Sequence, residues 1–399
     1  MSARRVLTGS VIALLMPASL LMATQTGSAS HDTTDATTQT TYRAKQRAKL
    51  VAMPQIAQQG KRVARADAAK AALTATIKPV RVGRPVKLQV KRGSAWKTVS
   101  KRKQDRKGRV EFVAAAAKGG EGLDYRVLAL PYQGLKAVKS RSESTERWLE
   151  ASFTDEFSGT TLDPIWSHRG QSYEPSSLRN CTKGDPRAVD VEGGAVRLSV
   201  MKDPDRSAKC VARKDGKSTG KFAYRLQGHI GTQSAYSFKY GFAAARIKMH
   251  KSRGQHGGFW MLPDRTVPGV GPKDGAEIDA IEYFGDKHPQ GGLTSFTYHH
   301  SGSKEVKTGD WIENPTSFLK NRRDGWSKNY HVFSVEWTPK AYIFRIDGRE
   351  TWRSTKGVSN VPEFPILSLL ASDYEISQIG SDRKLPQTMQ VDWLRVWER

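Results

Sequence analysis

The sequence has 399 residues, with 65 lysines and arginines against 39 aspartates and glutamates, which gives a formal net charge of +26. This length favours two or three domains of ordinary size. Residues 41–150 hold 27 basic and 8 acidic side chains, whereas residues 151–399 hold 36 and 29, so most of the excess charge lies in the N-terminal part. No recognisable nucleic-acid-binding motif accompanies this charge, and we therefore do not expect a nucleic-acid partner.

The first 29 residues have the pattern of a secretory signal peptide. Arg4 and Arg5 precede an apolar run over 6–23, and small polar residues follow it. Gly9 and Pro17 interrupt this run and weaken the alternative of a membrane anchor. We expect a secreted, extracellular protein that has no membrane attachment once the signal peptide is cleaved.

The two cysteines, Cys181 and Cys210, fit such an export. In an oxidising compartment they predict one disulfide bond, and two free thiols are the alternative. A bridge across a loop of this length stabilises a fold by about 3–4 kcal/mol. Two cysteines without a C-x-x-C pair do not favour a structural zinc site.

Residues 30–72 are rich in Thr, Gln, Ala, Lys and Arg and contain one aromatic residue, Tyr42. Such a composition buries too little apolar surface to offset the entropy of ordering, so it predicts a basic disordered linker. Its positive charge suggests an anionic cell-wall or matrix polymer as a binding partner. A solvated tail without a partner is the alternative.

Residues 73–145 show short apolar–polar alternation, bounded by glycine-containing turns, at 86–90, 110–113 and 125–130. This spacing predicts a small antiparallel β-sandwich, and it resembles the immunoglobulin-like accessory domains of secreted bacterial proteins. From residue 148 to residue 399, strand patterns dominate again, for example at 196–200 and 332–337. We expect an all-β protein in which this second part is one large two-sheet β-jelly-roll sandwich. We expect a monomer.

The segment 276–284 carries three carboxylates, Glu277, Asp279 and Glu282, among isoleucines and aromatic residues that favour a strand. Side chains alternate along a strand, so Glu277 and Asp279 share a face and Glu282 would lie on the other one. A β-bulge near residues 280–281 would return Glu282 to the first face. Crowded carboxylates raise one another's pKa values, which keeps one of them an acid near neutrality. This suits retaining glycoside hydrolysis, in which one carboxylate attacks and another protonates the leaving oxygen. A solvated strand and a divalent-cation site are the alternatives.

Motifs on both sides of this strand occur in a recognisable order. They include 153–159, 240–248, 254–263, 298–300, 331–339 and 391–396. With the carboxylates, these motifs resemble glycoside hydrolase family 16, the laminarinase-like β-jelly-roll enzymes, over about residues 150–399.

The resemblance implies roles for individual residues. Glu277 would be the nucleophile, Glu282 the general acid/base and Asp279 the assisting carboxylate. Five residues would contact the glycan: Trp260, His256, Tyr298, His300 and Trp166. For Trp260 and the histidines, a packing role in the fold is the alternative, and only one of the adjacent pair 299–300 can reach the cleft. The bulged spacing fits the laminarinase-like and galactanase branches of the family.

The reaction implied by the resemblance needs no cofactor, although some relatives hold a structural calcium ion on the convex face. Asp392, with backbone oxygens near Glu156 and Gly194, would be its ligands here. The expected activity is endo-hydrolysis of β-1,3- or β-1,3-1,4-glucan. A galactan hydrolase of the agar or carrageenan type, a transglycosylase and a non-catalytic glycan-binding protein are the alternatives.

Overall fold

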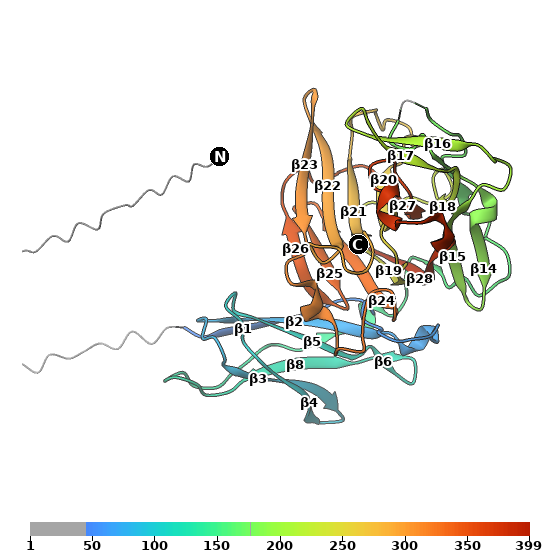
Figure 1. Cartoon of the computed structure of the whole chain (residues 1–399). Coiled ribbons are helices and arrows are strands. Elements are labelled where there is room, and N and C mark those ends of the chain that lie inside the picture. Colours follow the sequence, from blue (N-terminus) through green and yellow to red (C-terminus); the bar gives the residue numbers. More distant parts are fainter. Residues whose placement is uncertain (1–44, 176) are drawn as a thin grey trace, which may run out of the picture. The chain divides into compact units, whose positions relative to one another are not determined.

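The computed structural model describes residues 45–175 and 177–399 (Figure 1). The predicted signal peptide and residues 30–44 of the predicted linker lie outside the described residues. In the described part no helix has the length and apolarity to cross a membrane. Its helices are short 3-10 turns: η1 (Ala66–Ala68), η2 (Glu146–Trp148), η3 (Pro186–Ala188), η4 (Pro315–Phe318), η5 (Ile376–Ile379) and η6 (Asp382–Lys384).

Two small sheets and a short hairpin, β6-β7, form the N-terminal part of the described chain. One has the strand order β1-β2-β5 and the other β10-β8-β3-β4, with β9 beside β8. Their apolar residues share one core, which includes Leu73, Leu88 and Val127. The strands are β1 (Arg47–Ala52), β2 (Lys70–Lys78), β3 (Pro85–Arg92), β4 (Ala95–Lys103), β5 (Arg109–Ala115), β6 (Ala117–Lys118), β7 (Glu121–Gly122), β8 (Asp124–Ala129), β9 (Val138–Lys139) and β10 (Glu143–Ser144).

The expectation of a disordered linker up to residue 72 is wrong for residues 47–72. Strand β1 pairs along its whole length with β2, and Ile56 and Met53 are buried. Residues 53–65, which we call the strap, lie against the larger sheet, where the Gln58 side chain accepts a 2.7 Å hydrogen bond from Nε1 of Trp393. Composition misled the prediction because the few apolar residues of the segment are buried by a surface distant in sequence, not by one another.

The larger C-terminal part is a 16-stranded curved sheet, mostly antiparallel, that confirms the predicted jelly roll. One half has the order β23-β22-β21-β20-β27-β18 and the other β15-β28-β19-β24-β25-β26. Its strands are β11 (Phe153–Asp155), β12 (Ser167–His168), β13 (Thr182–Gly184), β14 (Val189–Glu192), β15 (Ala195–Lys202), β18 (Arg225–Gly231), β19 (Gly241–Lys248), β20 (His256–Pro263), β21 (Ala276–Tyr283), β22 (Leu293–Ser301), β23 (Lys304–Trp311), β24 (His331–Thr338), β25 (Ala341–Ile346), β26 (Arg349–Ser354), β27 (Glu363–Leu370) and β28 (Gln387–Glu398). A separate hairpin is made by β16 (Lys209–Lys214) and β17 (Lys217–Ala223).

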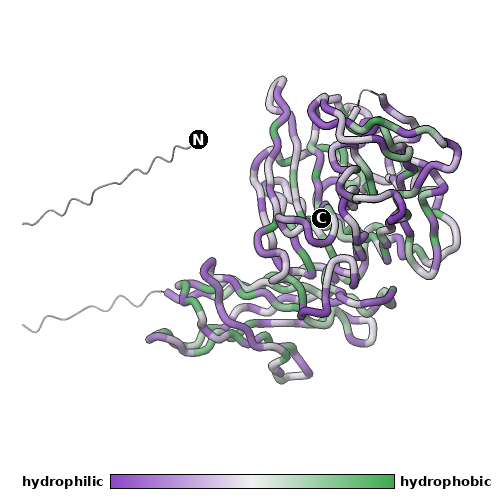
Figure 2. The backbone as a smooth tube through the Cα atoms, in the orientation of Figure 1, coloured by the Kyte–Doolittle hydropathy of each residue, from purple (hydrophilic) through white to green (hydrophobic). Residues whose placement is uncertain are grey.

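Strand β18 joins the two halves, because Gln227 pairs with β15 and the following residues pair with β27. Side chains from both halves meet in one core, with Phe259 and Ile278 from the first half and Val196 and Phe333 from the second. Apolar stretches accordingly follow the strands, while most connecting loops are hydrophilic (Figure 2). Because side chains alternate along a strand, the face of the first half that points away from this core can carry polar residues.

Candidate active site

The three carboxylates of the sequence motif all lie on β21. The pairing of this strand with both neighbours, β20 and β22, slips by one residue between Asp279 and Glu282. Ala280 is the extra residue on the β20 side, since Ile281 and Asp279 oppose consecutive residues there. The predicted β-bulge is therefore confirmed, and it places Glu282 on the face of Glu277 and Asp279.

These carboxylates line one cavity with residues from three other segments: the loop at Arg179, β20 and β27. Trp260 stands beside them on β20, held by a 3.0 Å hydrogen bond from its Nε1 to Oγ of Ser368 on β27. The cavity is lined by Arg179, His256, Gly258, Trp260, Glu277, Asp279, Glu282, Ser368 and Leu370. An aromatic wall next to clustered carboxylates is an arrangement that can hold a sugar ring against two acid–base groups.

Burial and mutual repulsion change how the carboxylates hold protons. Burial and the neighbouring charges of Glu282 and Glu305 raise the pKa of Glu277 to about 7. Asp279 is buried, and desolvation together with Glu282 and Glu277 raises its pKa well above the ordinary value. Glu282 accepts a 3.1 Å hydrogen bond from Oγ1 of Thr294. The group as a whole therefore retains at least one proton near neutrality, which is what general acid catalysis requires.

His256 lines the same cavity and forms a buried ion pair. Its Nδ1 lies 2.6 Å from Oε1 of Glu375, and its ring stacks on Phe284 with centroids 5.2 Å apart. Burial alone would lower the pKa of His256, but the charges of Glu375 and Glu282 raise it above its ordinary value. A protonated imidazole next to the carboxylates offsets part of their repulsion.

Two further predicted contacts, Tyr298 and His300, lie on β22. Tyr298 pairs with Glu277 across the β21–β22 ladder and is partly exposed. His300 is exposed and pairs with Glu305 of β23. It lies two residues after Tyr298, so its side chain points to the same face of the sheet. Its neighbour His299 points the other way, against Gly357. Both Tyr298 and His300 thus lie on the carboxylate face, Tyr298 directly beside the cavity.

Trp166 is not where a glycan contact would be. It is 4% exposed, packs against Phe157 at 5.9 Å between ring centroids, and donates from Nε1 to Asp155 at 2.7 Å. Because it belongs to the main hydrophobic core, the prediction of a substrate contact is wrong for this residue.

The sequence did not point to three residues that the fold brings to the site: Arg179, Ser368 and Glu375. Glu375 lies 119 positions from the histidine it pairs with, and Ser368 lies 108 positions from the tryptophan it holds. No local spacing pattern connects such residues. Only the pairing of β20 with β27, which brings residues near 260 beside residues near 366, could have indicated Ser368.

The residues expected to ligate calcium do not fit that ion. The Asp392 carboxylate forms a buried ion pair with Arg246, whose Nε also donates to the backbone oxygen of Gln58 in the strap at 2.6 Å. Glu156 receives two hydrogen bonds from Arg395, at 2.7 and 2.9 Å. The third expected position, Gly194, lies against Val63 of the strap. The one carboxylate expected to bind the ion, that of Asp392, is therefore already neutralised by a guanidinium group, and the described residues contain no cluster of three or more metal-binding side chains.

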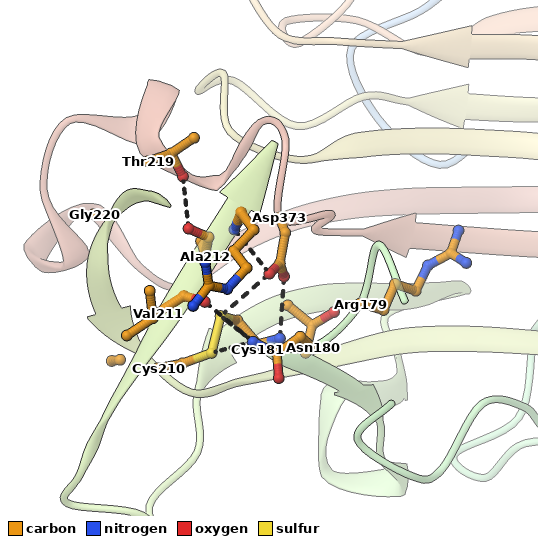
Figure 3. The surroundings of a disulfide bond; sticks show 12 residues. Arg179, Asn180, Cys181, Cys210, Val211, Ala212, Thr219, Gly220 and Asp373 are labelled. Atoms are coloured by element: carbon orange, nitrogen blue, oxygen red, sulfur yellow. Dashed lines mark hydrogen bonds between the residues drawn. A yellow bond between two sulfur atoms is a disulfide. The ribbon is translucent and has the colours of Figure 1, made fainter. Parts of the chain in front are cut away.

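The predicted disulfide between Cys181 and Cys210 is confirmed. Asp373 supports it by accepting a 3.1 Å hydrogen bond from the Cys181 backbone, and Asn180 donates to the backbone oxygen of Val211 at 3.1 Å (Figure 3). Arg179 is two positions before the bridge and points away from it (Figure 3). The bridge thus anchors the segment that carries Arg179 to the cavity.

Together, the jelly roll and the bulged strand of carboxylates define the class of β-sandwich glycoside hydrolases. Residues 186–395 match the Glycosyl hydrolases family 16 model, and the chain belongs to this family of retaining enzymes.

Two curated relatives and one solved structure illustrate the similarity. The chain is 27% identical over 272 residues to glucan endo-1,3-beta-glucosidase A1 of Niallia circulans, covering 61% of this chain and 37% of that protein. It is 25% identical over 212 residues to the beta-glucanase of Rhodothermus marinus, covering 52% and 65%. The laminarinase catalytic domain of Thermotoga maritima aligns with 18% identity and a TM-score of 0.49, over 63% of this chain and 98% of that one. The chain spans less than two thirds of the length of both curated relatives.

Proposed function

We propose that this chain is a secreted, retaining endo-β-glycan hydrolase that acts on β-1,3- or β-1,3-1,4-glucan. The observation that carries the proposal is the bulge in β21, which gathers three carboxylates around one cavity beside Trp260, with the pKa values of Glu277 and Asp279 raised. The names of the two curated relatives, a glucan endo-1,3-beta-glucosidase and a beta-glucanase, support glucan as the substrate.

The reaction follows from the positions of the carboxylates. Glu277 attacks the anomeric carbon, and Glu282 gives its proton to the glycosidic oxygen as the bond to that oxygen breaks. Glu282, now ionised, takes a proton from water, and the resulting hydroxyl displaces Glu277 with a second inversion at the same carbon. Asp279 lies between them in the strand and assists Glu277 by sharing a proton with it. Carboxylates supply both chemical roles, so the proposed reaction requires no cofactor.

Release of reducing ends from laminarin, lichenan, agarose and carrageenan tests the proposal. We expect cleavage of laminarin or lichenan, a loss of at least a thousandfold in Glu277→Gln and Glu282→Gln, and unchanged rates in the exposed control Glu313→Gln. Cleavage of agarose or carrageenan alone would reassign the substrate to a galactan. Binding of a glycan without cleavage would identify a non-catalytic protein, and elongated products with an added acceptor sugar would identify a transglycosylase.

We also propose that the basic N-terminal part holds the enzyme on an anionic polymer. In β4 the side chains of Lys101, Arg102 and Lys103 are exposed together. Replacing all three by serine should lower the salt concentration needed to elute the protein from an anionic wall polymer, without changing its rate on soluble glucan. Elution at the same salt concentration would contradict this role.

A further inference from the structure

A second cavity, of about 420 Å³, adjoins the carboxylate cavity and shares Arg179 with it. Arg169 and His229 are also in its wall, together with the side chains of Gln227 and Gln233. Its wall carries two cationic guanidinium groups, and its amide, hydroxyl and imidazole side chains can both donate and accept hydrogen bonds. Glu174 is the one carboxylate in its wall, and it is exposed, so solvent screens its charge.

The two arginines of this cavity differ from three buried arginines of the jelly roll. Arg225, Arg246 and Arg395 each form an ion pair with a carboxylate. Among the described residues, neither Arg169 nor Arg179 has such a partner. The Nε atom of each is also buried without a hydrogen-bond acceptor. The charge of Arg179 lowers the pKa of Glu277 in the neighbouring cavity, but neither arginine forms an ion pair with a carboxylate in the described part of the chain. A partly buried guanidinium without a paired carboxylate is costly, and an oxyanion bound by its nitrogen atoms would offset that cost.

The guanidinium group of Arg169 is held in place before any ligand binds. Arg169 lies over the ring of Phe364, 4.9 Å from its centroid, and donates to Oε1 of Gln233 at 2.7 Å. The backbone of Arg179 lies two residues before the disulfide at Cys181, which restrains the point where this side chain begins. Such preorganisation reduces the entropy lost on binding. A solvated surface arginine does not offer this advantage.

His229 connects this cavity to the proposed catalytic site. Its ring stacks on Trp260 with centroids 5.8 Å apart, and its Nε2 is buried without a partner. Burial, Arg169 and Arg179 together lower the pKa of His229 to about 3, so the ring is neutral at working pH. It can therefore hydrogen-bond a sugar hydroxyl without adding a charge.

We propose that this cavity is a subsite for an anionic substituent, a carboxylate or a sulfate ester, on a sugar next to the one being cleaved. Arg169 and Arg179 would bind the oxyanion from two sides, and His229 would bind a hydroxyl of the same sugar. The inference rests on the proposed function, because it assumes that a glycan lies across the β21 carboxylates. It differs from that function in predicting a preference for acidic over neutral glycan.

The test uses the full chain and three forms of one polymer: neutral, carboxymethylated and sulfated laminarin of equal chain length and low substitution. The variants are Arg169→Gln and Arg179→Gln, with the exposed Arg323→Gln as a control of identical charge change. We expect wild type to have a higher kcat/KM on one charged form than on the neutral form. Either cavity variant should lower the charged-to-neutral ratio at least tenfold, and the control should leave it unchanged. The charged form that responds identifies the oxyanion.

Three outcomes would overturn the subsite. One is a wild-type preference for neutral laminarin, and another is an equal loss on all three forms, as expected if the arginines only bind hydroxyls or balance the carboxylates. The third is the same change in Arg323→Gln, which would indicate general attraction to a basic protein. If no form is cleaved, the proposed function fails, and the same ratios measured as dissociation constants still decide whether the cavity selects an anion.

Discussion

The buried pair of Arg246 and Asp392 yields a sharp prediction about what holds the strap to the jelly roll. Their side chains are 1% and 3% exposed. In Asp392→Asn the guanidinium loses its counter-charge and keeps as acceptors the backbone oxygens of Gln58 and Arg62. Breaking a buried pair costs about 3–5 kcal/mol, and because two acceptors remain we expect a loss near the lower end, about 3 kcal/mol.

The measurement is the free energy of unfolding in urea, followed by tryptophan fluorescence and circular dichroism. A double-mutant cycle with Arg246→Met separates the pair from its surroundings. Each single change leaves one buried polar group without its partner, whereas the double change leaves no buried charge unpaired. The coupling energy should therefore be about 2–3 kcal/mol. The matched control is Glu192→Gln, which breaks the exposed pair with Arg197 and should cost about 0.5 kcal/mol or less. A cost below about 1 kcal/mol for Asp392→Asn, or a coupling near zero, would refute the reasoning.

Three other predictions follow from the site and its supports. The pKa of Glu277 is about 7 in the folded protein, above its value in the unfolded chain. The fold therefore loses stability as pH rises through 7 and this side chain becomes charged. Glu277→Gln should raise Tm relative to wild type at pH 8 but not at pH 4. Replacing His256 by Gln removes a positive charge beside Glu282 and retains a hydrogen bond to Glu375. The basic limb of the pH–rate profile should therefore move to higher pH. An unmoved limb would mean that His256 has only a packing role. Replacing both cysteines by Ala should raise KM more than it lowers kcat, because Arg179 loses its anchor, and equal effects on both would contradict this.

The sequence contained the chemistry of the site but not its surroundings. The parity of the spacing between Glu277 and Glu282, together with their strand-forming neighbours, was enough to predict the bulge that unites them. The alternation in 73–145 and beyond 148 likewise predicted two all-β parts. Both inferences depend on local periodicity, which a strand must obey wherever it lies.

What the sequence could not supply was contact between distant segments. Trp166 looks like any aromatic residue of a sugar cleft, and only the fold places it in the core beside Phe157. The Asp392 carboxylate suggests a cation site until Arg246 is found against it. The strap was mistaken for linker for the same reason, since its partners are about 190 to 335 residues away.

The contact between the strap and β28 also constrains the order in which the chain can fold during synthesis. Gln58 is made early, whereas Trp393, which donates to it, belongs to a strand that ends at Glu398. That same strand fills the space between β15 and β19 in the middle of the sheet. The jelly roll therefore cannot close until β28 has left the ribosome. Until then β15 and β19 each lack the strand between them, and such exposed strand edges are prone to aggregation until chaperones or folding cover them.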